Sequence, residues 1–357
     1  MIPKNITTKN ILKAILEIDK DSIPPNRHSK KYNLYFEGKP YPPKYVLSIA
    51  NKYANGEELS SIKFSGGTES NTFLMNLGFE IRVGHDSISK KPGESEASVI
   101  ITALIESDGH YDKPSRFALL EEILSKAARN TDVIILPGGF LKFSKLSDVD
   151  IKSIEKTVTS LLQKSNKNLV VCFGIDAPVE KHQLGIAISP KEIVAFGRKF
   201  YPTEHEKDEL VAAKSANEQE SGFERVFNWK GKKYFLAICY DSFGIKHLEL
   251  PKQNIDFIID FIHGFYPKTK GPSGEVYFAK NGLAGASKQW NCPAFGSAVF
   301  FNRLLPPAWP SGVQWKKGSM NTPDWKYNYN PLHFSSIKEF TTKHEKVIMR
   351  YFNVATR

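Results

Sequence analysis

The stretch KKYFLAICYDSFG, residues 232–244, joins an apolar run to an abrupt polar turn. The run has the length and composition of a buried strand, and it ends at Cys239, which is followed by Asp241, Ser242 and Gly244 of the turn. A cysteine in such a place is either a small buried apolar residue or a nucleophile. The stretch therefore predicts a sheet that has Cys239 at the end of one of its strands.

Similar apolar runs alternate with helical patterns on both sides of this stretch. Helices are expected at 117–130 and around 153–165, where apolar residues recur at helical spacing. Strands are expected at 97–107, 132–140, 168–176, 184–189, 192–200 and 256–265. Such alternation predicts an α/β protein whose sheets are covered by helices.

The composition is that of an ordinary soluble protein, with 41% hydrophobic and 24% charged residues among 357. This length allows two domains. No apolar run approaches the ~20 residues of a bilayer span, and the start MIPKNITTKN lacks the apolar stretch of an export signal. We therefore expect a cytoplasmic protein without a membrane partner.

The spacing of the three cysteines and the net charge are weaker indications of function than these patterns. Cys172, Cys239 and Cys292 are widely spaced and have no accompanying histidine cluster, so we expect neither a disulfide framework nor a metal site, and no cofactor. Cys172 and Cys292 are expected to be structural. The net charge of +11 is scattered along the chain, and it makes nucleic-acid binding only slightly more plausible than a well-solvated surface.

A polar segment with proline and glycine, residues 85–98, separates two patterned regions and is predicted to be a linker. Before it, residues 1–84 carry helical patterns at 10–23 and 44–56 around a strand and turn at 31–43, which predicts a small α+β domain. After it, residues 99–357 are expected to form the α/β domain.

Four segments of this second region resemble, in order, the motif series of the nitrilase (carbon–nitrogen hydrolase) superfamily. They are DVIILPGGF (132–140), FGRKFYPTEHE (196–206), FLAICYDSFG (235–244) and LAGASKQWNCPAFGSAVF (283–300). The resemblance covers roughly residues 97–320 and implies that family's αββα four-layer sandwich. It also implies oligomerisation through the sheet region and a small-molecule substrate.

The resemblance assigns roles to three residues. Cys239 stands at the place of the nucleophile that attacks a nitrile or amide carbon. Lys199 stands at the place of the lysine that stabilises the developing negative charge, and Glu206 at the place of the carboxylate that orients substrate and lysine. Without the motifs, Lys199 and Glu206 would be expected to be solvated surface residues.

One residue of the family's pattern is missing. Where the family has the general-base glutamate of Pro-Glu-Gly, this chain has Gly138. Loss of a positioned base costs ~10²–10⁴ in rate. Glu106, at the end of the strand 97–107, is the candidate replacement, and His263 is a candidate substrate contact or a structural histidine.

Residues 10–82 resemble the N-terminal head domain of McrA-type modification-dependent restriction endonucleases. The match lies in Tyr-Pro-Pro-Lys-Tyr-Val (41–46), Phe-Ser-Gly-Gly (64–67) and Leu-Gly-Phe (77–79). The prolines stop a strand and start a helix, and the glycines form a turn whose amides suit a phosphate. The residues expected to contact DNA are Arg27, Lys30, Lys31, Lys44, Gly66 and Gly67. The alternative is that the glycines and prolines serve only as turn residues.

Two main hypotheses of function follow. The first is a thiol-dependent carbon–nitrogen hydrolase in a DNA-linked, phage-defence context. The second is a catalytically inactive nitrilase-fold sensor or binding module in a DNA-targeting restriction system. Gly138 favours the second, whereas Cys239, Lys199 and Glu206 favour the first. A plain DNA-binding protein is the third alternative.

Overall fold

The computed structural model describes residues 2–21, 23–24, 27–29, 32–36, 39–61, 63–83, 96–106, 113–267, 274–305, 309–315, 330–332 and 334–355. The chain divides into two compact units, Met1–Gly93 and Glu94–Arg357, which we call the head unit and the large unit. Most of the expected linker 85–98 lies outside the described residues, and its last three residues begin a strand.

The head unit combines helices with a small antiparallel sheet of strand order β2-β1-β3. Its elements are α1 (Thr8–Asp21), β1 (Tyr32–Phe36), β2 (Lys39–Tyr41), α2 (Pro43–Asn55), α3 (Thr68–Asn76) and β3 (Glu80–Val83). Leu34, at the centre of the sheet, is fully buried in the unit's apolar core. This arrangement confirms the small α+β domain predicted from the sequence.

Helix α2 begins and ends where its sequence predicts. Pro43 stands in the first turn, where its missing N–H group costs no hydrogen bond. Gly56 follows the last turn in the left-handed conformation, with φ of 89°, and its N–H group donates to the carbonyl of Lys52. The helix is thereby closed at both ends.

The large unit contains parallel and antiparallel strands and the helices between them. Its first elements are β4 (Glu96–Glu106), α4 (Lys113–Lys126), β5 (Val133–Ile135), β6 (Leu141–Lys142), α5 (Asp148–Lys164), β7 (Val170–Ala177), β8 (His182–Ile188) and β9 (Ile193–Arg198). The following elements are β10 (Val226–Trp229), β11 (Lys232–Ile238), α6 (Asp241–His247), β12 (Phe257–Phe265), α7 (Gly274–Phe278), the π-helix η2 (Ala279–Leu283), α8 (Ala284–Trp290) and β13 (Ala294–Phe301). The last are β14 (Gly312–Gln314), β15 (Asn330–Pro331), β16 (Ser336–Thr341) and β17 (Glu345–Ala355).

Strand β4 joins two halves of one large sheet whose order is β10-β11-β12-β13-β4-β5-β7-β8-β9. Residues 99–101 of β4 pair with β5, and residues 103–106 pair with β13. The strands from β11 to β7 in this order run parallel, so their carboxyl ends lie on the same side of the sheet. Side chains that follow these strands are therefore candidates for a common site.

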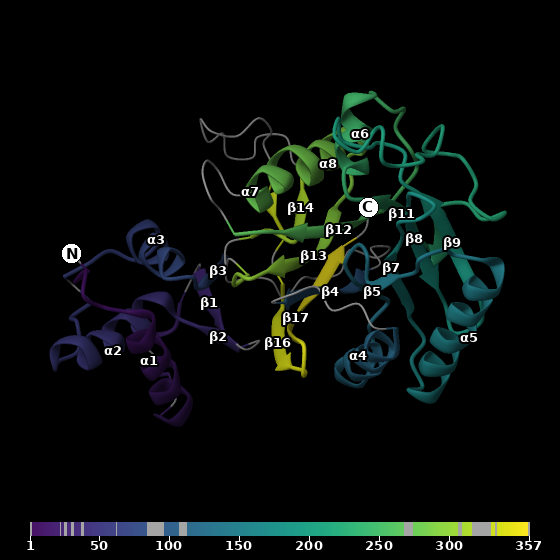
Figure 1. The fold of residues 1–357 in the computed structure, drawn as a ribbon. Helices are drawn as coiled ribbons and strands as arrows, with labels where there is room; N and C mark the ends of the chain where they lie inside the picture. The colour runs from purple at the N-terminus through teal and green to yellow at the C-terminus, as the bar shows by residue number, and fades with distance from the viewer. Residues whose placement is uncertain are drawn as a thin grey trace. The chain divides into compact units, whose positions relative to one another are not determined.

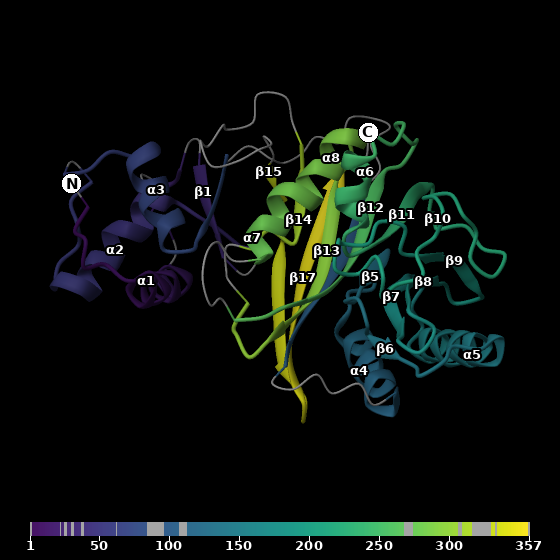
Figure 2. The same ribbon diagram turned by 45° about the horizontal axis from the view of Figure 1, so that its top comes forward.

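The two halves of the sheet pack face to face, and helices cover their outer faces. Helices α4 and α5 share an apolar core with β4, β5, β7 and β8, while α6, η2 and α8 share another with β11, β12 and β13. A third core, which includes Val133, Leu236 and Phe261, lies between the halves. Figure 1 and the turned view in Figure 2 show α4 and α5 on one side of the strands and α6 and α8 on the other. The predicted αββα order of layers is confirmed.

Within the described ranges, none of the helices combines the length and the apolar character that a bilayer crossing requires.

Candidate active site

Cys239 occupies a sharp turn between β11 and α6. Its backbone has φ of 53°, a left-handed conformation that is uncommon for residues other than glycine and often marks functional sites. The N–H group of Cys239 donates to the carbonyl of Phe261 on β12 at 3.0 Å, which fixes the turn against the neighbouring strand. The residue is half-buried, so its thiol is shielded but reachable.

His263, near the end of β12, lies between Cys239 and a carboxylate. Its Nε2 is 2.9 Å from Oδ1 of Asp176. Asp176 is the last residue but one of strand β7. The side chain of His263 also forms a hydrogen bond with the thiol of Cys239. The three side chains thus make a continuous series from sulfur to imidazole to carboxylate, the arrangement by which proteins activate a nucleophile.

The neighbours shift the ionisation of both partners. Burial opposes the thiolate, but the charge of Lys199 and the hydrogen bond from His263 outweigh it, so the pKa of Cys239 lies below its ordinary value. Burial likewise opposes the imidazolium, yet the carboxylate of Asp176 and the adjacent sulfur raise the pKa of His263 to about 10. Each charged form thus stabilises the other, and the site favours the thiolate of Cys239 and the imidazolium of His263 more than water would.

Gly138 and Gly139 leave the space that this histidine and this aspartate occupy. A Cβ atom on Gly138 would lie 2.7 Å from the carbonyl oxygen of Phe261 and 3.0 Å from Nδ1 of His263. At Gly139, which has φ of 60°, a Cβ atom would lie 2.6 Å from Oδ2 of Asp176. The lack of a side chain at position 138 is thus what accommodates His263.

A side chain restored at position 138 is expected to damage the site. In Gly138→Ala or Gly138→Glu the new Cβ meets a backbone carbonyl, which cannot move as a flexible side chain can, so His263 must shift away from Cys239. We expect the pKa of Cys239 to rise in both variants, measured as the pH midpoint of its alkylation by iodoacetamide. A Gly138→Glu protein with an unchanged or lower midpoint would contradict this account.

Lys199 follows strand β9 and is 1% exposed. Its Nζ donates to both carboxylate oxygens of Glu206, at 2.8 and 2.7 Å, and to Oε1 of Gln183 at 2.8 Å. The carboxylate of Glu206 in turn accepts from the backbone N–H group of Thr203 at 2.8 Å. Burial opposes the charge of Glu206, but Lys199 outweighs it, so the pKa of that carboxyl is lowered. The pair holds a buried cation close enough to act on the thiol of Cys239.

Asp241 ties the cysteine turn to the segment that carries Lys199. The carboxylate is fully buried, and it accepts from the backbone N–H groups of Phe200 and Tyr201 at 2.9 Å and of Ile238 at 3.1 Å. It also pairs with the buried guanidinium of Arg225 at 3.1 Å. One carboxylate therefore sets the distance between nucleophile and cation.

Cys239, His263 and Glu206 line a cavity of about 300 Å³. Its wall includes polar side chains on several strands and loops: Lys142, Asp176, Gln183, Glu206, Cys239 and His263. Such a cavity has the size of a small-molecule site with a few convergent polar groups. Among the described residues, no cluster of three or more histidine, cysteine, aspartate or glutamate side chains is arranged to hold a metal ion.

The structure brings four of the residues singled out from the sequence together and leaves one apart. Cys239, Glu206 and His263 line the cavity, and Lys199 contacts Glu206. Glu106, expected as the replacement base, is absent from the cavity wall. It is 3% exposed and forms a buried ion pair with Arg116 of α4, because β4 ends beside that helix. Its carboxylate links β4 to α4 through this ion pair.

Three participants were not singled out from the sequence. Asp176 was predicted only as the last residue of the strand 168–176. An acidic residue at the end of a buried run could have indicated a site residue. Asp241 stands in the turn after the run that ends at Cys239, but its partner Arg225 is assigned only by the fold, as is the partner of Gln183, Lys199.

The residues expected to contact DNA belong to the head unit. Arg27, Lys44, Gly66 and Gly67 line one cavity there. Lys30 and Lys31, expected to share that role, lie outside the described residues.

Fold and site together define an αββα protein with a cysteine, a histidine–aspartate pair and a buried lysine–glutamate pair at the carboxyl ends of its strands. Residues 4–83 match the family described as the ScoMcrA-like N-terminal head domain, which confirms the resemblance stated for residues 10–82. Among curated proteins, none matches the chain in sequence.

Solved structures similar to this chain include the NitN amidase from Nesterenkonia sp. AN1, at 8% identity and a TM-score of 0.47, covering 71% of this chain and 92% of that one. A CN-hydrolase superfamily protein from Xanthomonas campestris, with an arsenic adduct in its active site, has 15% identity and a TM-score of 0.41, covering 57% and 76%. Nit3 from Saccharomyces cerevisiae, of branch 10 of the nitrilase superfamily, has 12% identity and a TM-score of 0.41, covering 72% and 90%.

Proposed function

We propose that this protein hydrolyses the C–N bond of a small amide or nitrile-type substrate, with Cys239 as nucleophile and His263 as general acid and base. One observation carries the proposal: the hydrogen-bonded series from Cys239 through His263 to Asp176, beside the buried Lys199–Glu206 pair. His263 takes the role for which Glu106 was considered.

For an amide, the first half-reaction forms a thioester. The thiolate of Cys239 attacks the carbonyl carbon, a C–S bond forms, and the C=O electrons move to oxygen. Lys199 gives two of its hydrogen bonds to one carboxylate, so one N–H group can turn to that oxygen while the ion pair with Glu206 persists. The C–N bond then breaks, the imidazolium of His263 protonates the nitrogen, and the amine leaves.

The second half-reaction consumes water. The thioester sulfur carries no charge, so one of the influences that raise the pKa of His263 is removed, and the neutral imidazole accepts a proton from water. The hydroxyl oxygen bonds to the acyl carbon and the C–S bond breaks. The carboxylic acid leaves, and the thiolate and imidazolium are restored. Amide and water have become acid and amine.

A second function is favoured by a specific observation, the glycine at position 138 in place of the family's base. In this alternative the large unit binds a small molecule without hydrolysis and serves as the sensor of a DNA-targeting restriction or defence system. The match of residues 4–83 to a restriction-enzyme head domain supports a DNA-linked context for either function.

The two functions can be distinguished because only the hydrolase transfers an acyl group to Cys239. With p-nitrophenyl acetate as probe, we expect the purified full chain to release a burst of about one equivalent of p-nitrophenolate and then to turn over, because a thioester forms faster than it is hydrolysed. Cys239→Ala should lose the burst, whereas Cys292→Ala, which removes a buried thiol outside the cavity, should keep it. A burst that survives Cys239→Ala, or none in the unaltered protein, would favour the sensor.

A further inference from the structure

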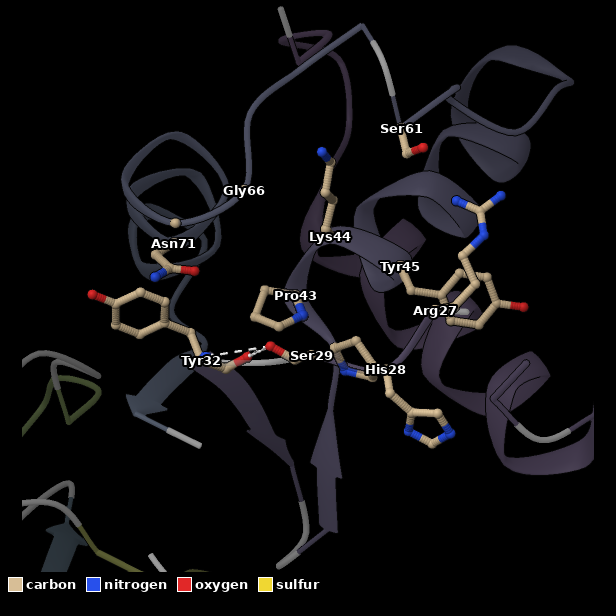
Figure 3. Close-up of a pocket in the computed structure, with 12 residues that line it drawn as sticks. Arg27, His28, Ser29, Tyr32, Pro43, Lys44, Tyr45, Ser61, Gly66 and Asn71 are labelled. Carbon is tan, nitrogen blue, oxygen red and sulfur yellow. Dashed lines mark hydrogen bonds between the residues drawn. The ribbon is translucent and has the colours of Figure 1, made fainter. Parts of the chain in front are cut away.

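The head unit contains a cavity of about 660 Å³, within the range typical of ligand pockets. It lies between the start of α2, the start of α3 and the segment before β1, and Figure 3 shows its walls. The residues that line it are Arg27, His28, Ser29, Tyr32, Pro42, Pro43, Lys44, Tyr45, Ser61, Gly66, Gly67 and Asn71. Nothing in the proposed hydrolysis uses this cavity.

One wall is cationic. Lys44, on the first turn of α2, packs along the glycine turn before α3, because its Cδ lies 3.6 Å from the position of a Cβ atom on Gly66. Its Nζ is 5.2 Å from the ring centroid of Phe64, and among the described residues no carboxylate lies within ion-pair distance of it. Gly67, with φ of 72°, sets the helix start of α3 against the same cavity. A lysine and a helix start together suit a phosphate group.

Another wall is flat and aromatic. The guanidinium of Arg27 lies 5.6 Å from the ring centroid of Tyr45 and makes only a long ion pair, 3.9 Å, with Glu58. Figure 3 shows Tyr45 and Arg27 on one side of the cavity and Tyr32 on the opposite side, with Pro43 between them. Planar rings and a guanidinium plane are surfaces on which a nucleobase stacks.

The third wall holds a buried amide. Asn71 on α3 is 7% exposed, and its Oδ1 accepts no hydrogen bond from the described residues. In Figure 3 its amide lies on the cavity side of α3, close to Tyr32. A buried polar atom without a partner is unusual and costs free energy unless a ligand satisfies it. An asparagine amide both donates and accepts, as the polar edge of a nucleobase requires.

From these walls we propose that the head cavity binds one nucleotide, with its base between Tyr45 and Tyr32, its polar edge at Asn71 and its phosphate at Lys44 and the Gly66–Gly67 turn. The nucleotide can come from DNA, by extrusion of one base from the duplex, or from the free pool. The head unit would then read a base rather than only the phosphate backbone.

Fluorescence anisotropy of the full chain tests the proposal, with two labelled duplexes that differ by one mismatched pair. Extrusion costs least at a mismatch, so we expect at least about tenfold tighter binding to the mismatched duplex. Asn71→Ala should abolish this preference and leave the salt dependence unchanged. Lys44→Gln should weaken binding to both duplexes and reduce the salt slope by about one. Lys20→Gln, an exposed charge of α1 away from the cavity, should leave the preference intact.

A parallel titration with deoxynucleoside monophosphates separates the two sources. Binding of monophosphates but not of duplexes, lost in Asn71→Ala, would support the site with a free nucleotide as its ligand. Equal binding of both duplexes that is unaltered in Asn71→Ala would overturn the proposal in favour of backbone contact. Failure of both ligands to bind would also overturn it. If Asn71→Ala lowers the melting temperature of the protein, Tyr45→Leu, which keeps the bulk but removes the aromatic face, takes its place. These outcomes do not depend on the hydrolase activity of the large unit.

Discussion

His263→Ala is expected to lower turnover of p-nitrophenyl acetate by ~10²–10⁴ and to leave an acetyl group on Cys239. In the proposed reaction the imidazole takes a proton from water, and its hydrogen bond lowers the pKa of the Cys239 thiol. Without it the thioester still forms, more slowly, but is no longer hydrolysed efficiently. Stopped-flow absorbance gives the two rates, and peptide mass spectrometry locates the acetyl group.

His205→Ala is the matched control, because this histidine is exposed, neighbours Glu206 in sequence and does not line the cavity. Its turnover should equal that of the unaltered protein. The turnover of Asp176→Asn should lie between those of His263→Ala and the unaltered protein. This substitution keeps the size of the side chain beside His263 but removes the charge that raises the pKa of His263. Turnover of His263→Ala within about threefold of normal would exclude a general-base role of the ~10²–10⁴ kind.

Asp241→Ala is expected to lower the free energy of unfolding of the large unit by about 3–5 kcal/mol, because it leaves the buried guanidinium of Arg225 without its partner. It also removes the acceptor for the backbone N–H groups of Phe200, Tyr201 and Ile238. Urea unfolding monitored by tryptophan fluorescence measures the change.

The matched control for this variant is Glu121→Ala, which breaks an ion pair with Lys164 whose two side chains are 50% and 72% exposed. An exposed pair contributes about 0–1 kcal/mol, so this variant should unfold almost as the unaltered protein does. Similar midpoints for Asp241→Ala and Glu121→Ala would show that Asp241 does not tie the cysteine turn to the Lys199 segment.

The apolar runs predicted an α/β protein whose sheets are covered by helices, whereas the αββα order of layers was implied by the resemblance to the nitrilase superfamily. The paired strands expected at 184–189 and 192–200 are β8 and β9, which run antiparallel. By contrast, β16 and β17 were not predicted. The run Glu345–Ala355 mixes charged and apolar residues, and its long antiparallel pairing with β4 joins segments more than two hundred residues apart, which no local pattern encodes.

The site was predictable only where its residues stand in local motifs. Cys239, Lys199 and Glu206 were found because each has a characteristic neighbourhood in sequence. The pairing of His263 with Asp176 spans 87 residues and two strands, so the sequence indicated His263 only as a substrate contact or a structural histidine. Glu106 was a candidate because it ends a predicted strand. The sequence does not specify which helix lies beside that strand end, and in the structure the carboxylate of Glu106 pairs with Arg116.

The most direct test of the account is the pH profile of iodoacetamide labelling at each cysteine, read by mass spectrometry between pH 5 and 10. We predict a labelling midpoint for Cys239 below the value of about 8.5 of an ordinary thiol, because its pKa is lowered, and a rise of this midpoint in Lys199→Ala and His263→Ala. Cys172, whose pKa burial raises, should label far more slowly throughout. A midpoint for Cys239 at or above the ordinary value, unaltered in both variants, would contradict an activated nucleophile at this site.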